Sequence, residues 1–197
     1  MSLFVKICGI TSVEAADAAV AAGADALGFV FAESPRQVTP AQASEITRNV
    51  PGHVEKVAVF LRPQRGEIEA VLAGFNADTI QANWSYLAGF EGRPVLPVVR
   101  DGGSSELDGR RILFEGRRSG AGERADWTLA ADLARRSPLI LAGGLNSQIV
   151  RSAIQSVHPF GVDVSSGVES SPGIKDIRLI NGFINEVRKI ERAVVTK

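Results

Sequence analysis

The residues whose types and spacing best suit chemistry lie in two successive strand-and-turn units. One apolar run ends in Gly143-Gly144, just before Asn146, and the next ends in Ser165-Ser166-Gly167. Glycines leave backbone N–H groups open to an anion, and asparagine favours a helix N-cap, so we expect a helix over residues 146–156. Two neighbouring parallel strands that end this way would form one concave set of donors, although ordinary tight turns and helix caps are the plainer alternative. The predicted phosphate-binding residues are Gly143, Gly144, Asn146, Ser165, Ser166 and Gly167.

Short apolar strands alternate with helices along the 197 residues. The strands are expected at residues 3–9, 26–31, 54–60, 79–82, 95–99, 112–114, 139–144 and 160–164. The helices are expected at residues 13–22, from Thr39-Pro40 onward, and at 64–73, 84–87, 127–136, 146–156 and 176–192. This alternation predicts a parallel sheet, and eight such units predict a closed (β/α)₈ TIM barrel.

Two connections depart from the regular pattern. The helix after the fourth strand is only a stub, and the glycine- and charge-rich link Arg100–Arg111 resembles a loop that replaces the next helix. A second glycine-rich loop is expected over Gly116–Gly122. Since no composition break divides the chain, residues 1–197 are predicted to form one α/β barrel domain.

The composition is that of an ordinary soluble globular protein, with 45% hydrophobic and 22% charged residues. The 22 basic and 22 acidic side chains leave no net charge, which argues against a nucleic-acid partner. The single cysteine cannot form an internal disulfide, and neither a cationic leader nor a membrane-length apolar run is evident. We therefore expect a cytoplasmic protein without a membrane partner, either a monomer or a homodimer, that binds a small phosphorylated molecule.

In such a barrel, chemistry occurs where strands end and the following loops begin. His53 and His158 both precede strands, so they are expected at the opposite face, which argues against histidine catalysis. The candidates at the working face are Cys8, Arg36, Gln81, Asn83, Asp101, Glu115, Asp126, Asp163 and the turn at 165–167.

Strand parity selects among these candidates, because alternate side chains of a barrel strand face the lumen. The apolar residues of the first strand suit the helix-facing side, which directs Lys6 and Cys8 into the barrel. By the same rule Asp163 of the eighth strand faces inward, and Glu115 faces inward across from Cys8. Plainer alternatives are a small buried hydrophobe for Cys8, a solvated loop carboxylate for Glu115 and a turn anchor for Asp163.

The chain also resembles the phosphoribosylanthranilate isomerase family, in motifs spread over nearly its whole length. The N-terminal motifs are Lys6-Ile7-Cys8-Gly9-Ile10-Thr11, Gly28-Phe29-Val30-Phe31 and Ser34-Pro35-Arg36. The later motifs are Asp126-Trp127, Gly143-Gly144-Leu145-Asn146 and Val162-Asp163-Val164-Ser165-Ser166-Gly167-Val168-Glu169. The resemblance implies a (β/α)₈ barrel that catalyses the Amadori rearrangement of phosphoribosylanthranilate in tryptophan biosynthesis, without a metal or cofactor.

The resemblance implies roles for individual residues. Cys8 matches the cysteine base that takes the ribose C2′ proton, and Lys6 or another nearby cation would favour its thiolate. Arg36 matches the arginine that holds the anthranilate carboxylate, a task suited to a guanidinium fork. Gln81 and Asp163 are assigned to substrate binding. The glycine and serine turns match the family's phosphate site.

Two departures from the family pattern affect the mouth of the barrel. Phe114-Glu115 stands where the family has leucine–aspartate, and Gln81-Ala82-Asn83-Trp84 stands where it has Gln-Leu-His-Gly. We assign the acid that protonates the ring oxygen to Glu115, whose extra methylene moves the proton by about an ångström. Asp126 is expected to cap a helix or brace a loop. The alternatives are a diverged isomerase of another phosphorylated aminosugar and a non-catalytic barrel that binds a phosphate ligand.

Overall fold

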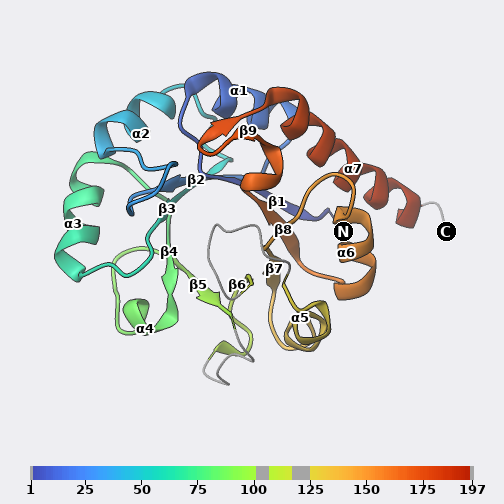
Figure 1. Ribbon diagram of the computed structural model, residues 1–197. Coiled ribbons are helices and arrows are strands. Elements are labelled where there is room, and N and C mark those ends of the chain that lie inside the picture. The colour runs from blue at the N-terminus through green and yellow to red at the C-terminus, as the bar shows by residue number, and fades with distance from the viewer. Residues whose placement is uncertain (1, 101–106, 117–124, 196–197) are drawn as a thin grey trace.

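The computed structural model describes residues 2–100, 107–116 and 125–195. Eight parallel strands close into a barrel in the order β1 to β8, with helices around the outside (Figure 1). The predicted TIM barrel is therefore confirmed. Among the described residues, no helix is both long and apolar enough to cross a membrane.

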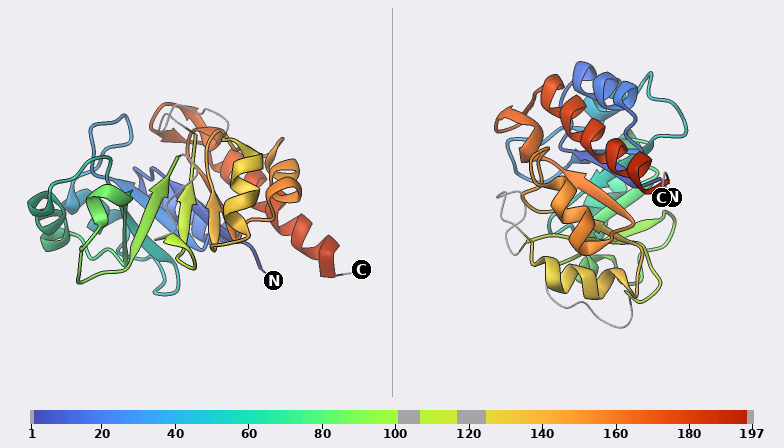
Figure 2. Two further views of the ribbon diagram at one scale, coloured as in Figure 1. Left: turned by 90° about the horizontal axis from the view of Figure 1, so that it is seen from below. Right: turned by 90° about the vertical axis from the view of Figure 1, so that its right-hand side faces the viewer.

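The barrel strands lie close to their expected positions. They are β1 (Phe4–Cys8), β2 (Ala26–Val30), β3 (Glu55–Val59), β4 (Thr79–Asn83), β5 (Val95–Val99), β6 (Ile112–Phe114), β7 (Leu139–Leu141) and β8 (Gly161–Val164). The helices are α1 (Val13–Ala22), α2 (Pro40–Ile46), α3 (Arg65–Gly74), α4 (Trp84–Leu87), α5 (Trp127–Ala134), α6 (Val150–Val157) and α7 (Ile177–Val195). The side views show α5 and α7 on the outer surface of the strands (Figure 2).

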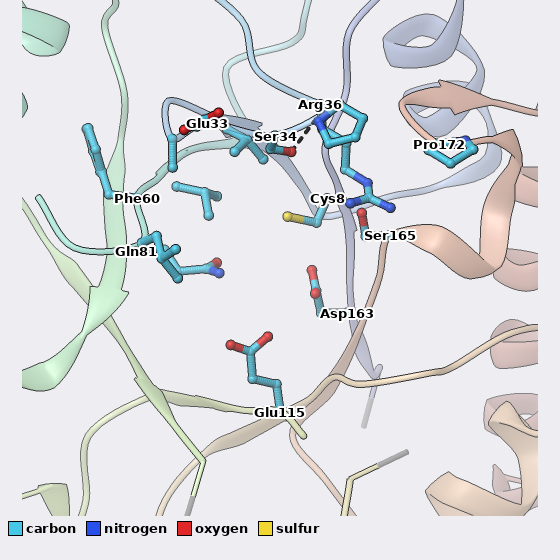
Figure 3. Close-up of a pocket in the computed structure, with 15 residues that line it drawn as sticks. Cys8, Glu33, Ser34, Arg36, Phe60, Gln81, Glu115, Asp163, Ser165 and Pro172 are labelled. Carbon is cyan, nitrogen blue, oxygen red and sulfur yellow. Dashed lines mark hydrogen bonds between the residues drawn. The ribbon is translucent and has the colours of Figure 1, made fainter. Parts of the chain in front are cut away.

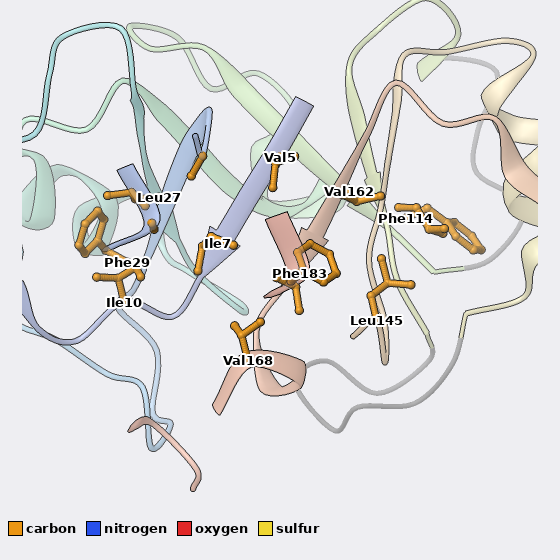
Figure 4. Close-up of a cluster of buried hydrophobic side chains, with 14 of the residues drawn as sticks. Val5, Ile7, Ile10, Leu27, Phe29, Phe114, Leu145, Val162, Val168 and Phe183 are labelled. Atoms are coloured by element: carbon orange, nitrogen blue, oxygen red, sulfur yellow. The ribbon is translucent and has the colours of Figure 1, made fainter. Parts of the chain in front are cut away.

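The core has an inner and an outer part, as strand parity requires. Alternate strand residues such as Val5, Ile7 and Val162 pack outward against the helices, in a cluster that also contains Phe183 of α7 (Figure 4). A smaller inner cluster fills part of the lumen with Leu96, Val98, Leu113, Ile140 and Ala142. The alternation of side chains along each strand thus separates the apolar cluster under the helices from the cluster in the lumen.

Helix starts follow local capping chemistry where the prediction was right. Thr39 and Gln42 form a reciprocal capping box at the start of α2, with Pro40 at the first helical position. Asp126 caps α5 by accepting hydrogen bonds from the N–H groups of Thr128 and Leu129, at 2.9 and 3.1 Å. Capping is therefore the role that the structure shows for Asp126.

The predicted start of α6 was wrong. The Asn146 side chain accepts hydrogen bonds from the N–H groups of Gln148 and Ile149, at 2.9 and 3.2 Å. These bonds close a turn, and the helix begins only at Val150. An asparagine side chain can cap a turn as readily as a helix, which explains the error.

The structure also contains a β-hairpin that was not predicted from the sequence. After the short 3₁₀ helix η2 (Ser166–Val168), strands β9 (Glu169–Ser171) and β10 (Ile174–Lys175) pair antiparallel. Of the two irregular connections, α4 is confirmed as a short helix, and residues 107–111 form no α-helix. Residues 101–106 of the predicted loop Arg100–Arg111, with Asp101 among them, and residues 117–122 of the loop Gly116–Gly122 lie outside the described residues.

Candidate functional site

A cavity of about 430 Å³ opens at the ends of the barrel strands. Cys8, Gln81, Glu115 and Asp163 reach it from four different strands or strand ends, as Figure 3 shows. Its full lining is Cys8, Val30, Ala32, Glu33, Ser34, Pro35, Arg36, Val59, Phe60, Leu61, Gln81, Glu115, Asp163, Ser165 and Pro172. The inward orientations predicted for Cys8, Glu115 and Asp163 are therefore confirmed, whereas their roles remain predictions.

Lys6 and Asp163 form a buried ion pair in the lumen. The Lys6 ammonium lies 2.7 Å from Asp163 Oδ1, and its side chain is fully buried. Burial by itself lowers the pKa of Lys6, but the charges of Asp163 and Cys8 outweigh burial and raise it above the ordinary value. Lys6 is therefore a fixed cation.

Burial is the dominant influence on the Cys8 thiol. It raises the pKa of Cys8 above its ordinary value, an effect that Lys6 and Lys175 oppose and that Asp163 reinforces. The sequence-based expectation that Lys6 favours the thiolate has the right sign for Lys6 alone. The net direction is upward, because desolvation penalises the thiolate more than the two lysines stabilise it.

Arg36 is held by Glu169, a carboxylate that is not among the predicted site residues. Its Nε and Nη2 atoms lie 2.7 and 2.8 Å from the two oxygens of Glu169, with Lys175 Nζ 2.7 Å from the same carboxylate. Burial opposes ionisation of Glu169, but hydrogen bonds from Arg36 and Lys175 hold its pKa below the usual range. The Nε edge of Arg36 is thus occupied, and a ligand would meet its other edge, formed by Nη1 and Nη2.

The backbone around Arg36 is built for close approach. Gly9 has a φ of +75°, and a Cβ there would lie 2.5 Å from Arg36 Cδ. Gly173, in the turn of the β9–β10 hairpin, has a φ of +85°, and a Cβ there would lie 2.2 Å from the Pro35 carbonyl oxygen. The hairpin therefore packs against the loop that carries Arg36.

Lys175 connects the same hairpin to the serine turn. Its Nζ donates to the Ser165 carbonyl oxygen at 3.0 Å and to Ser165 Oγ at 3.3 Å, and its side chain is fully buried. Burial lowers the pKa of Lys175, although Glu169 opposes this. The Ser171-Pro172-Gly173 segment is a turn signal between short strands, and could have revealed the hairpin from the sequence.

Gln81 presents an unsatisfied acceptor to the cavity. The residue is 6% exposed, and its Oε1 atom is buried without a hydrogen-bond partner in the part of the chain that the structure describes. In Figure 3 its amide group points into the cavity. Buried acceptors are rarely left unpaired, so this oxygen stands out among the polar atoms around the cavity.

Glu115 is part of a polar arrangement at the ends of three neighbouring strands. Arg100 forms an ion pair with Glu115 Oε1 and also donates to Asn83 Oδ1. Asn83 and Trp84 do not line the cavity, and the Trp84 ring instead contacts the Arg110 guanidinium at 5.5 Å. Of the residues that depart from the family pattern, only Glu115 reaches the cavity.

The two predicted phosphate turns lie against each other. A Cβ at Gly167 would lie 1.9 Å from the Leu145 carbonyl oxygen, and Gly143 and Gly144 adopt φ values of +89° and +65°. The backbone N–H groups of Gly143, Gly144, Ser166 and Gly167 donate to no other described residue. Only Ser165 of the predicted set lines the 430 Å³ cavity.

The two histidines lie before strands, as predicted from the sequence. His158 ends α6 with a φ of +51° just before β8, and His53 precedes β3, so both lie away from the cavity. In the described ranges, no cluster of three or more His, Cys, Asp or Glu side chains could hold a metal ion.

The comparisons with known proteins agree on one family. The profile of N-(5'-phosphoribosyl)anthranilate (PRA) isomerase matches residues 5–83 and 102–186. The N-(5'-phosphoribosyl)anthranilate isomerase of Oceanobacillus iheyensis is 37% identical, over 95% of this chain and 98% of its own length.

Solved structures give the same result. A phosphoribosyl anthranilate isomerase in complex with reduced 1-(o-carboxyphenylamino)-1-deoxyribulose 5-phosphate is 35% identical, with a TM-score of 0.82 and coverage of 95% and 99% of the two chains. Generated monomers of the dimeric isomerase from Thermotoga maritima are 34% identical, with a TM-score of 0.81 and the same coverage.

Proposed function

Because the chain belongs to the N-(5'-phosphoribosyl)anthranilate isomerase family, we propose that it catalyses the Amadori rearrangement of N-(5'-phosphoribosyl)anthranilate in tryptophan biosynthesis. The observation that carries this proposal is that Cys8 and Glu115 line one cavity from β1 and from the end of β6. An acid and a base on different sides of one cavity suit proton transfer at two positions of a small sugar.

The chemistry needs one group to donate and another to accept. Glu115, as the carboxylic acid, gives its proton to the ring oxygen while the C1′–O bond breaks and the nitrogen lone pair forms the C1′=N bond. Cys8, as the thiolate, then takes the C2′ proton, and the electrons of that C–H bond form an enolamine. Tautomerisation of the enolamine gives the ketose product. No redox partner is required.

The rest of the site would bind the two ends of the substrate. The free edge of Arg36 suits the anthranilate carboxylate, and Gln81 and Asp163 suit the sugar hydroxyls. The N–H groups of the Gly143–Asn146 and Ser165–Gly167 turns suit the phosphate, since backbone donors at such turns favour anions. Asn146 contributes through its turn.

The alternative of a different phosphorylated aminosugar was suggested by Asn83, Trp84 and Glu115. Asn83 and Trp84 lie outside the cavity lining, so neither residue supports a different substrate by direct contact. A non-catalytic phosphate binder would need neither Cys8 nor the Arg36–Glu169 pair at its cavity. The leading proposal therefore requires the fewest unexplained residues.

The decisive experiment is a steady-state assay of the purified protein with N-(5'-phosphoribosyl)anthranilate. We expect turnover by the wild type, loss of turnover in Cys8→Ser, and restored growth without tryptophan in a strain that lacks the isomerase. A folded wild-type protein that neither turns over this substrate nor restores growth would refute the proposal. Sedimentation equilibrium decides between monomer and homodimer, and fractionation tests the proposed cytoplasmic location.

A further inference from the structure

We propose that Arg100 is a positioning residue for this reaction. Its guanidinium joins Asn83 to Glu115 and holds the Glu115 carboxyl group at the cavity. The inference rests on the proposed function and deepens it. It concerns how the candidate acid is kept in place, and it assigns Arg100 no contact with substrate.

The strand register places Arg100 level with Glu115, and Asn83 two residues before that level. Asn83 ends β4 and pairs with Val98 of β5, and Val99 pairs with Phe114 of β6. Arg100 follows Val99, and Glu115 follows Phe114, so the three side chains come from the ends of three consecutive strands. A guanidinium at the middle position can therefore reach both neighbours.

The hydrogen bonds use separate nitrogens of the guanidinium. Nη1 donates to Asn83 Oδ1, and Nη2 donates to Glu115 Oε1. The planar guanidinium fixes the angle between these bonds, so an acceptor on one side orients the donor on the other. Asn83 thus serves to orient Arg100, which in turn fixes the position of Glu115.

Burial distinguishes this contact from an ordinary surface ion pair. The side chains of Arg100 and Glu115 are only 20% and 13% exposed, whereas the pair Arg48–Glu45 is exposed by 69% and 56%. Exposed pairs contribute little, because water screens them and the side chains lose entropy. A partly buried pair at a cavity edge restricts the carboxyl group far more, and small misplacements of a catalytic group are costly.

The chain couples its two departures from the family pattern through this contact. Residues 83 and 115 are both unlike the family pattern, and both bind the same guanidinium. The longer carboxylate at 115 and the short amide at 83 are therefore parts of one arrangement. Changing either should disturb the other through Arg100.

The test is a double-mutant cycle on turnover. Arg100→Gln should lower kcat by about ten- to a hundredfold with little change in KM, since it misplaces the acid without removing a substrate contact. In the Glu115→Gln background, the same change should lower kcat by less than about threefold, because the group it positions is gone. Arg100→Lys should fall between, since an ammonium lacks the planar geometry.

Arg93→Gln is the matched control. Arg93 lies at the other end of β5 and donates to Asn76 on the exposed surface, at 2.9 Å. We expect wild-type kcat and KM. Crystal structures of the wild type and Arg100→Gln should show the Glu115 carboxyl group displaced from the cavity in the variant.

The outcomes separate the inference from the proposed function. Turnover by the wild type combined with additive losses in the cycle, or an unmoved Glu115 in the Arg100→Gln structure, would overturn the inference alone. Absence of turnover by the wild type would overturn the proposed function and the positioning role with it. Non-additive losses together with a displaced Glu115 would support both.

Discussion

The Lys6 ammonium group lies 2.7 Å from the Asp163 carboxylate, on the same face of β1 as Cys8. Gly28 of the neighbouring strand leaves room for both side chains. A Cβ there would lie 2.9 Å from Cys8 Sγ and 3.1 Å from Lys6 Nζ. The thiol is therefore packed beside a fixed cation and is largely buried at the edge of the cavity.

The first prediction concerns the ionisation of Cys8. Because burial raises the pKa of Cys8, the thiolate should form only as the pH rises above the ordinary thiol value of about 9. The rate of alkylation by iodoacetamide should therefore still increase with pH above that value. Lys6→Met should move this rise to higher pH, since it removes a cation that lowers the pKa.

The control for this variant addresses the unpaired Asp163. Lys6→Met leaves a buried carboxylate without its partner, which is costly for folding. The double variant Lys6→Met/Asp163→Asn removes both charges and should fold more readily, with alkylation rates measured alongside circular dichroism. A wild-type alkylation rate that levels off at a pH well below the ordinary thiol pKa would contradict the raised pKa of Cys8.

The second prediction concerns the contact between the two phosphate turns. Gly167→Ala places a methyl group 1.9 Å from the Leu145 carbonyl oxygen, so the turns must separate. We expect weaker binding of inorganic phosphate in titration calorimetry, and a higher KM for the phosphorylated substrate. The wild-type and variant titrations should be made at the same ionic strength.

Gly182→Ala is the matched control. Gly182 lies in α7, with nothing within 4 Å of an added Cβ. Alanine there should leave phosphate binding unchanged and stabilise the fold by about 0.5–1 kcal/mol through helix propensity. If Gly167→Ala binds phosphate as tightly as Gly182→Ala, the ligand does not depend on these turns.

The third prediction concerns acid stability. The pKa of Glu169 is held below its ordinary value of 4.5, so its carboxylate stabilises the folded state above about pH 4.5. That contribution is lost as the pH falls through the lowered folded-state pKa. Glu169→Gln should therefore lower the urea midpoint at about pH 7, and the difference from wild type should narrow near pH 3.

Glu186→Gln provides the comparison. Glu186 also contacts two cations, Arg151 and Lys189, but on the exposed surface of α7. Exposed pairs contribute little, so its midpoint should stay close to wild type at both pH values. A constant deficit for Glu169→Gln across the pH range would show that packing, not charge, explains its effect.

Strand alternation made much of this molecule predictable. The apolar strands and their parity indicated the barrel and the inward direction of Cys8, Asp163 and Glu115, because a period of two is fixed by backbone geometry. The Thr39-Pro40 pair located the start of α2 for the same local reason. These features depend on neighbours within a few residues.

Features that depend on distant partners were not predictable in the same way. The sequence does not show that Glu169 binds both Arg36 and Lys175, since those contacts need the hairpin to fold back on the β2–α2 loop. The late start of α6 arose because Asn146 had two local capping choices. Arg100 looked like the first residue of a loop, and its partners became evident only from strand register.

The last prediction concerns Glu115. As the proposed acid it should contribute about a hundred- to ten-thousandfold to the rate, so Glu115→Gln should lose most turnover while keeping its shape. If the longer side chain were a defect, Glu115→Asp would keep or raise activity. The Arg100 contact changes that expectation, because Glu115 reaches its partner with its full length. Aspartate would withdraw the carboxyl group by about an ångström, which can cost roughly a hundredfold.

We therefore expect the order wild type, Glu115→Asp, Glu115→Gln in kcat, with similar KM values and unchanged circular dichroism. The pH profile gives a second reading, since only Glu115→Gln removes an ionisable group. In the Glu115→Gln variant, the decrease in kcat at high pH should disappear if Glu115 must be protonated to act. Glu115→Asp at or above wild-type turnover would show that contact with Arg100 is not needed for activity. Turnover unchanged in Glu115→Gln would mean that another group donates the proton to the ring oxygen.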